Sequence, residues 1–263
     1  MKNTISNCID RLGISVFDGK RMSRVLDSVI KELSFEIFVN GRHLVNQACT
    51  GHHLEELAAG FLRSEGLIDN RDDLVEIELS REAPRIDIRI KNRIPGKGFS
   101  RSISSSGARG VSGTVPGSAP KADFHVSPAQ VLQLMKRLMQ ASIIHDVTRG
   151  THCSALANPK DIIAAREDIG RHNTIDMLGG YALLNGIDCS DKILLTTGRV
   201  SSEIIIKARR IGVPMVISHS VATSKAVRMA QELNICLVGY VRGGKFRVYA
   251  GDRVSIKARK EAI

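Results

Sequence analysis

Tryptophan is absent from this chain of 263 residues, and all aromatic residues together make up only 4% of it. The core is therefore expected to be mainly aliphatic, and a hydrophobic content of 43% is enough for one large or two small domains. No apolar stretch approaches the length of a membrane span, and the first residues lack the apolar run of a signal peptide. We therefore expect a cytoplasmic protein without a membrane partner.

Cysteine is sparse as well, and its spacing excludes two classes of site. The five cysteines are scattered and never in C-x-x-C spacing: Cys8, Cys49, Cys153, Cys189 and Cys236. This is neither a disulfide framework nor a thiolate zinc site, and it suits a reducing cytoplasm. A zinc deaminase would need H-x-E and P-C-x-x-C, but Ser154 stands two positions after His152 and the second motif does not occur. We predict no metal site and no zinc.

Negative charge is scarce in two regions of a chain whose net charge is +11. Lys and Arg outnumber Asp and Glu by 13 to 3 over residues 199–260 and by 8 to 1 over residues 85–121. Such regions indicate an anionic partner, namely a phosphate-bearing ligand, a nucleic acid or an acidic protein, or else a solvated basic surface. Nothing resembles a nucleic-acid-binding motif, so a nucleic acid is an unfavoured partner.

The C-terminal half has the pattern of an α/β fold. Short apolar runs typical of strands occupy residues 193–195, 213–217 and 235–240, and helical periodicity lies between them. This order implies parallel pairing with right-handed crossovers, and residues 246–249 then return as a hairpin arm. The polar turns after parallel strands gather at one edge of the sheet, where ligands usually bind. That edge is the first candidate site.

Residues 1–95 are predicted to form a small α+β portion. Weak periodicity up to about residue 30 indicates a loosely packed arm. Asn40-Gly41 predicts a hairpin turn, and residues 75–79 and 86–90 alternate apolar and charged side chains as half-exposed strands do.

Two helices are predicted with defined ends. One carries Leu54 to Leu62 and stops at Gly66, with Thr50 or Gly51 as its cap. The other opens at Ser127-Pro128, and its Met135 and Met139 are expected in the core.

Residues 96–121 are rich in Gly and Ser and have no periodic apolar face. We expect a flexible loop there, between the N-terminal portion and a domain formed by residues 122–263. Composition favours a linker, although long irregular loops are often functional.

Residues 168–173 bring a carboxylate, a cation and an imidazole to the start of a helix. Its free N–H groups and Arg171 could bind a phosphate or carboxylate. In the alternative interpretation, Asp168 or Asn173 merely caps the helix and His172 faces solvent. Both interpretations stay open.

Three further motifs carry candidate residues. Gly198 and Arg199 precede a helix and form a plausible anion cradle that is not a Walker A loop. Residues 239–245 could hold a purine base or a phosphate, but spacing favours a hairpin turn with exposed cations. His152 adjoins Cys153, yet adjacent residues rarely face each other as base and nucleophile, so a buried histidine is preferred and a ligand contact comes second.

Taken together, these segments resemble the formate dehydrogenase accessory family (FdhD/NarQ). The resemblance extends in order from about Glu36 to Tyr249, through residues 36–41, 54–68, 148–156, 167–173, 197–203 and 239–243.

The resemblance implies a cytidine-deaminase-like, three-layer C-terminal domain without the zinc site, a small N-terminal α+β domain and a homodimer. It also implies a sulfur carrier that takes persulfide sulfur from a cysteine desulfurase. The sulfur is passed to the molybdenum cofactor, bis(molybdopterin guanine dinucleotide), before that cofactor enters formate dehydrogenase, and GDP is a plausible mimic. The cofactor contact of the family carries over to Tyr240, Val241, Arg242, Gly243, Gly244 and Lys245, and we add His152, Arg171, His172 and Arg199 as candidates.

The chain departs from the family at the loop that carries a C-x-x-C motif. Ser106 stands in the position of the cysteine that bears the persulfide, and Arg109 in that of the second cysteine. A hydroxyl forms no persulfide, so sulfurtransferase activity stays open. Either another thiol substitutes, with Cys153 as the best candidate, or the chain binds the cofactor without sulfur transfer. Arg149 also replaces a glycine expected before Gly150.

Overall fold

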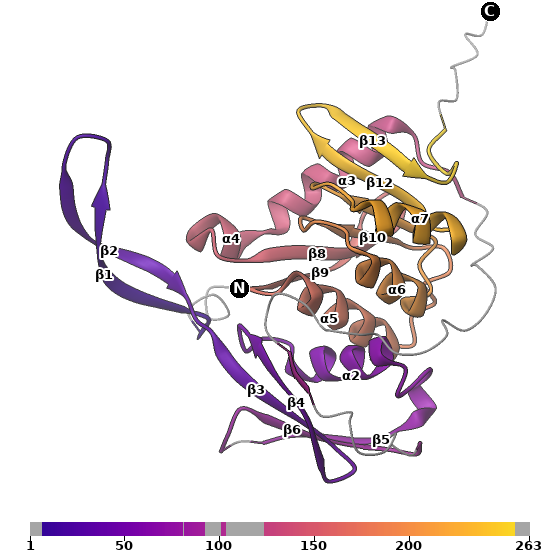
Figure 1. Cartoon of the computed structure of the whole chain (residues 1–263), viewed down its shortest axis with the longest axis horizontal. Coiled ribbons are helices and arrows are strands. Elements are labelled where there is room, and N and C mark those ends of the chain that lie inside the picture. The colour runs from indigo at the N-terminus through magenta and orange to yellow at the C-terminus, as the bar shows by residue number, and fades with distance from the viewer. Residues whose placement is uncertain (1–6, 81, 93–100, 104–123, 256–263) are drawn as a thin grey trace, which may run out of the picture.

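The computed structural model describes residues 7–80, 82–92, 101–103 and 124–255, which form two β-sheets with their helices and a projecting hairpin (Figure 1). The larger sheet has six strands in the order β13-β12-β11-β10-β8-β9, and the smaller has five in the order β5-β6-β3-β4-β7. In this described part of the chain no helix is long and apolar enough to cross a membrane.

The C-terminal half forms the six-stranded sheet. Its strands are β8 (His152–Ala157), β9 (Ile162–Asp168), β10 (Ile193–Thr196), β11 (Met215–Ser218), β12 (Cys236–Arg242) and β13 (Lys245–Ala250). β10, β11 and β12 are parallel, whereas β8, β9 and β13 run antiparallel to their neighbours. The predicted parallel unit and its returning hairpin arm are confirmed.

Helices cover both faces of this sheet. Helix α3 (Pro128–Ala141) packs on one face, and α5 (Arg171–Leu184), α6 (Ser202–Ile211) and α7 (Ser224–Glu232) pack on the other. Consecutive strand residues point to opposite faces, so Leu194 lies in the core with α5 to α7 and Leu195 in the core with α3. The mixed α/β class and the three layers are confirmed, and the likeness to cytidine deaminases stays a prediction.

The α3 region differs from expectation in two details. Met135 is buried, but Met139 is 36% exposed, so its predicted place in the core is wrong. A second helix, α4 (Ile143–Thr148), follows at once and was not predicted. The Glu167 carboxylate accepts hydrogen bonds from the N–H groups of Ile144 and His145, at 2.8 and 2.9 Å. Because Glu167, a residue distant in sequence, stabilises the first turn of α4, the local sequence pattern did not predict this helix.

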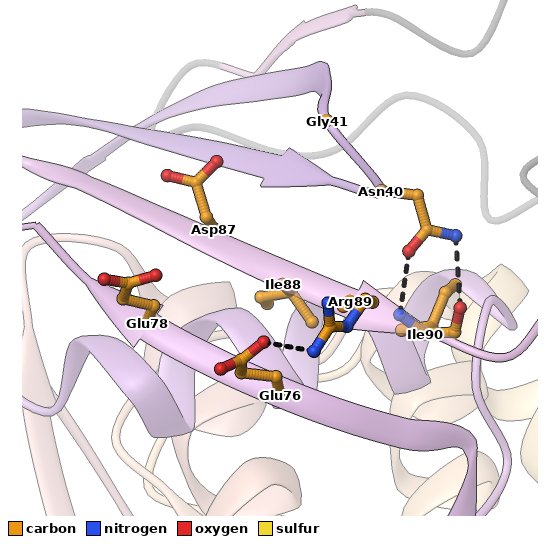
Figure 2. Close-up of a pocket in the computed structure, with 8 residues that line it drawn as sticks. All are labelled: Asn40, Gly41, Glu76, Glu78, Asp87, Ile88, Arg89 and Ile90. Carbon is orange, nitrogen blue, oxygen red and sulfur yellow. Dashed lines mark hydrogen bonds and ion pairs between the residues drawn. The ribbon is translucent and has the colours of Figure 1, made fainter.

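The N-terminal half forms the five-stranded sheet, which α2 covers. Its elements are β3 (Leu33–Val39), β4 (Arg42–Cys49), α2 (Leu54–Glu65), the 3₁₀ helix η1 (Arg71–Asp73), β5 (Leu74–Leu79), β6 (Arg85–Ile90) and β7 (Arg101–Ile103). Asn40 and Gly41 have φ of 49° and 75°, which confirms the predicted hairpin turn. Figure 2 shows the Asn40 amide bridging the backbone N–H and carbonyl of Ile90, at 2.9 and 3.2 Å.

Strand β7 lies within the segment predicted as a flexible loop, residues 96–121. It pairs in parallel with β4. The remainder of that segment, including Ser106 and Arg109, lies outside the described residues, and the domain boundaries stay a prediction.

Residues 9–30 form a hairpin of β1 (Ile9–Phe17) and β2 (Met22–Ile30) that projects from the body (Figure 1). Most of its side chains are exposed on both faces, which explains the weak apolar periodicity of this segment. The arm predicted here is thus a regular two-stranded ribbon, which we call the β1–β2 arm.

The two halves join through α2 and α5, which cross at glycines. A Cβ at Gly60 would lie 1.7 Å from the carbonyl oxygen of Asp176, and one at Gly180 would lie 1.9 Å from that of Glu56. The Arg166 guanidinium adds two hydrogen bonds to the Glu56 carboxylate, at 2.5 and 2.7 Å. Backbones in direct contact leave no room for any side chain at these glycines.

A buried ion pair lies beside this crossing. Lys207 of α6 and Asp176 of α5 are each 1% exposed, and the ammonium lies 2.6 Å from both carboxylate oxygens. Ser64 of α2 donates to the same carboxylate at 2.5 Å. Lys207, from the same half of the chain, compensates the charge of Asp176, and docking of the N-terminal half adds the Ser64 hydrogen bond.

We expect Gly60→Ala to destabilise the protein by about 3 kcal/mol or more, because the helices must separate to admit the methyl group. Urea unfolding followed by circular dichroism measures the change. Gly13→Ala is the matched control, since a Cβ at Gly13 has no neighbour within 4 Å. Equal stabilities of the two variants would contradict the proposed close packing.

Candidate functional site

Polar turns from four strands meet at one edge of the six-stranded sheet. β8 is antiparallel to β10, so the start of β8 lies beside the end of β10, where Thr197 donates its N–H to the Cys153 carbonyl at 2.9 Å. The His219 N–H donates to Thr196 at 3.0 Å, and the Tyr240 N–H donates to Ser220 at 2.7 Å. The predicted gathering of these turns is confirmed.

A pocket of about 350 Å³ opens at this edge, between the sheet and the α3–α4 region. It is lined by Met139, His145, Arg149, Gly150, Thr151, His152, Ile169, Thr197 and His219. We call it the edge pocket. Of the predicted site residues it contains His152 alone. Sequence analysis missed Met139 and His145 because neither lies in a polar turn. His219 lies in the turn after β11, so the sequence pattern could have identified it as a site residue.

The edge pocket contains three histidines, His145, His152 and His219. Burial lowers the pKa of His152, and the nearby Arg171 lowers it further. Burial also lowers the pKa of His219, with Arg242 as the second cause. His145 Nδ1 lies 2.6 Å from the Thr151 carbonyl oxygen, which accepts only, so this nitrogen carries the proton. Because burial lowers the pKa values of His152 and His219 below the usual 6.5, both imidazoles are neutral near pH 7.

Arg171 and Arg199 come from two separate motifs that the fold brings together. Arg171 is the first residue of α5, and a Cβ at Gly198 would lie 2.9 Å from its Cβ. Burial lowers the pKa of Arg171, and the exposed Arg199 adds to the effect as a like charge. Among the described side chains, Arg171 Nε and Ser201 Oγ are buried without a hydrogen-bond partner. The Glu203 carboxylate partly offsets these effects on Arg171, and two arginines remain close together on this side of the edge.

His172 is buried, with only 5% of its surface exposed, so the alternative that it faces solvent is wrong. Burial is the main reason why its pKa falls to about 3, and Lys207 and Arg171 add to the shift. Glu203 lies 3.6 Å from its Nε2. His172 is a neutral group behind the edge and does not supply a cation to a ligand.

Asp168 is not the helix cap, which is Gly170. Its buried carboxylate accepts four hydrogen bonds: from the N–H and hydroxyl of Thr50, from the Gly170 N–H and from the Asn173 amide. Thr50 was a predicted cap for α2, and this prediction is wrong, since the cap is His53. The bonds from Thr50 to Asp168 instead connect the end of β4 with the start of α5. Burial nevertheless raises the pKa of Asp168.

The segment Tyr240 to Lys245 is a hairpin turn with exposed cations, the interpretation that spacing favoured. Gly243 and Gly244 have φ of 59° and 71°, and Arg242 and Lys245 are exposed. The Arg242 guanidinium lies 3.9 Å from the centre of the Tyr240 ring. Val241 is buried in the core with α3, which counts against its side chain as a cofactor contact.

All five cysteines are buried, each at 4% exposure or less. Burial raises the pKa of Cys49 and Cys153 to about 12 and that of Cys189 to about 11. It also raises the pKa of Cys8 and Cys236. Cys153 therefore lacks the accessible thiolate that a substitute sulfur carrier needs. Throughout the described ranges, no three His, Cys, Asp or Glu residues lie close enough together to hold a metal ion.

This geometry defines an α/β protein with polar turns and cations at one sheet edge, and comparison with known proteins gives the family. The sequence model of the FdhD/NarQ family matches residues 30–255. Two relatives bear the name sulfur carrier protein FdhD. The one from Halalkalibacterium halodurans is 35% identical over 94% of this chain and 95% of its own length. The one from Bacillus subtilis is 36% identical over 89% of this chain and 92% of its own.

A solved structure supports the fold. A protein from Desulfotalea psychrophila, described as a formate dehydrogenase accessory protein, superposes with a TM-score of 0.79 at 24% identity, covering 94% of this chain and 100% of its own. The chain belongs to the FdhD/NarQ family.

The neutral, buried His172 predicts a pH dependence of stability. Below pH 6.5 the unfolded chain binds a proton at this imidazole, whereas the folded chain does so only near pH 3, so stability falls as pH is lowered between these values. From pH 6.5 to pH 5 the loss is about 2 kcal/mol. Urea unfolding at both pH values measures it. His172→Gln should reduce the loss, and His125→Gln, at an exposed position, should not; identical pH profiles for all three proteins would contradict the assignment.

Proposed function

We propose that this chain acts in formate dehydrogenase maturation and binds the bis(molybdopterin guanine dinucleotide) form of the molybdenum cofactor as its cargo. One observation carries the proposal: Arg171 and Arg199 lie together at the starts of α5 and α6, and Arg242 and Lys245 flank the turn after β12 at the same edge of the six-stranded sheet. The description of the Desulfotalea psychrophila protein as a formate dehydrogenase accessory protein supports the link to formate dehydrogenase, and we place this function in the cytoplasm.

The residues at this edge suit phosphate groups. Guanidinium groups bind phosphate through paired hydrogen bonds, and helix starts offer free N–H groups and a positive dipole end. Arg171 and Arg199 repel each other, which is the second cause of the lowered Arg171 pKa. An anion between them would remove that repulsion and supply the partner that buried Nε of Arg171 lacks in the described structure.

We infer a second candidate function, in which the chain holds and delivers the cofactor without carrying sulfur. The burial of all five thiols favours it, since a persulfide forms on an accessible thiolate. Ser106 and Arg109 offer no thiol where the family has two. In the sulfur-carrying version the partners are a cysteine desulfurase and formate dehydrogenase. In the second version only the dehydrogenase is required, and a homodimer is compatible with both.

GDP should bind the natural chain, and Arg199→Gln and Arg242→Gln should each weaken that binding about five- to ten-fold, because each removes a cation from the edge. Calorimetric titration at low salt measures the affinity. Arg24→Gln is the matched control, since Arg24 is an exposed arginine on the β1–β2 arm. Unchanged affinity in both edge variants, or no GDP binding at millimolar concentration, counts against cofactor binding at this edge.

A sulfur-loading experiment distinguishes the two candidate functions. After incubation with a cysteine desulfurase and cysteine, the natural chain should carry no persulfide by mass spectrometry, because its thiols are buried and protonated. The Ser106→Cys/Arg109→Cys variant should gain one. In a strain lacking the accessory protein, formate dehydrogenase activity restored by the natural chain without persulfide supports the second candidate. A persulfide on any natural cysteine would support sulfur carriage instead.

A further inference from the structure

The β1–β2 arm has two chemically different faces, which its pairing register separates. Directly paired residues of an antiparallel ribbon lie on the same face, and successive residues alternate between the two faces. One face therefore carries four pairs, namely Phe17 with Met22, Ser15 with Arg24, Gly13 with Leu26 and Arg11 with Ser28. We call it the arginine face. The opposite face carries both carboxylates of the two strands, Asp10 and Asp27.

The arginine face exposes three large apolar side chains to solvent. Met22, Phe17 and Leu26 are 63%, 62% and 61% exposed, whereas the other large apolar side chains of the described ranges reach 48% at most. Leu26 is uncovered because its cross-strand neighbour is Gly13, which has no side chain. Apolar side chains gathered on one exposed face are typical of an interaction surface.

The charge of the arginine face is positive. Arg11 and Arg24 alternate with its apolar side chains, and the described residues of this face include no carboxylate. A partner that complements the face therefore has an acidic surface. A second copy of the chain does not meet this requirement, because a symmetric contact would place the arginine face of one copy against the same arginines of the other.

The base of the arm adjoins the candidate site. Strand β2 contacts α4, and a Cβ on Gly150, which lines the edge pocket, would lie 2.7 Å from Ile30 Cγ2. From this base the ribbon projects away from both sheets (Figure 1). Its strands have nine residues each, which corresponds to a length of about 30 Å. A protein bound along the arm is thus held next to the edge where the cargo is proposed to bind.

We propose that the arginine face docks the protein that receives the cargo, through an acidic surface with apolar depressions for Phe17, Met22 and Leu26. The proposal rests on the function proposed above, in which the acceptor is formate dehydrogenase. A lone two-stranded ribbon is only marginally stable in water, and the acceptor supplies the surface that covers it. The arginines attract the acidic surface, and the apolar side chains hold it once it is bound.

Binding of the full-length chain to formate dehydrogenase prepared without molybdenum tests the docking by surface plasmon resonance. We expect the natural chain to bind at micromolar concentration. Phe17→Ser should weaken binding about ten-fold or more, because it removes an aromatic anchor. Arg24→Gln should slow association about three- to ten-fold, because it removes an attracting charge. Leu12→Ser is the matched control and should change neither quantity, since Leu12 is an exposed apolar residue on the opposite face.

GDP titration of the same proteins distinguishes the docking from the proposed cargo binding. All three variants should bind GDP as the natural chain does, which also shows that they are folded. Unchanged dehydrogenase binding by Phe17→Ser and Arg24→Gln, with GDP still bound, overturns the docking and leaves cargo binding standing. If the natural chain binds no GDP, cargo binding is refuted, and the comparison of Phe17→Ser with Leu12→Ser still decides whether the dehydrogenase docks on the arginine face.

Two further measurements examine other occupants of the arginine face. A natural dimer that Phe17→Ser converts to a monomer in sedimentation velocity would show that a second copy covers the face. Flotation with vesicles of phosphatidylglycerol and phosphatidylcholine that Phe17→Ser abolishes would show that a lipid surface does. Either result overturns the docking of the acceptor. We expect the sedimentation and the flotation of Phe17→Ser to match those of the natural chain.

Discussion

The structure depends on the crossing of α2 and α5, where two backbones touch through Gly60 and Gly180. This contact sets the distance between the two sheets, and charged groups on either side fit only at that distance. Asp176 receives a serine hydroxyl from one half and a lysine ammonium from the other. The docked arrangement therefore gives this buried carboxylate a charge from α6 and one further hydrogen bond from α2. The N-terminus of α5, with its arginine, is positioned by the same contact.

The chain illustrates a separation between a binding surface and the group that reacts on it. The edge keeps its cations, its helix starts and its pocket, all of which depend on backbone course and packing. Sulfur carriage depends on an accessible thiolate, and the sequence has Ser106 and Arg109 at the two loop positions where the family has cysteine. The family relationship therefore establishes the scaffold more firmly than the chemistry. In this chain the described thiols are buried and their pKa values are raised, so the scaffold and the sulfur chemistry have to be tested separately.

Local pattern was sufficient for most elements, because apolar runs and turn residues such as Asn40-Gly41 act within a few residues of themselves. It failed where distant residues decide. Glu167 binds the start of α4 from 22 and 23 residues away, and Thr50 binds Asp168 in the other half of the chain instead of capping its own helix. His172 appeared exposed because its polar neighbours did, and only the packing of α6 beside it shows that it is buried. The edge pocket combines α3, α4, the start of β8 and the turns after β9, β10 and β11, a set that no single motif could reveal.

The hydrogen bonds of Asp168 have a consequence for how the chain can be divided. Two of the four come from Thr50, at the end of β4, and Asn173 also binds the Ala48 carbonyl at 2.7 Å. The first turn of α5 is thus completed by the N-terminal half. A C-terminal fragment would retain every residue of the candidate edge yet leave this carboxylate half-satisfied beside Arg171. The candidate site therefore depends on both halves of the chain. A chimera that exchanges one half between relatives must preserve the hydrogen bonds that join Thr50 and Ala48 to Asp168 and Asn173.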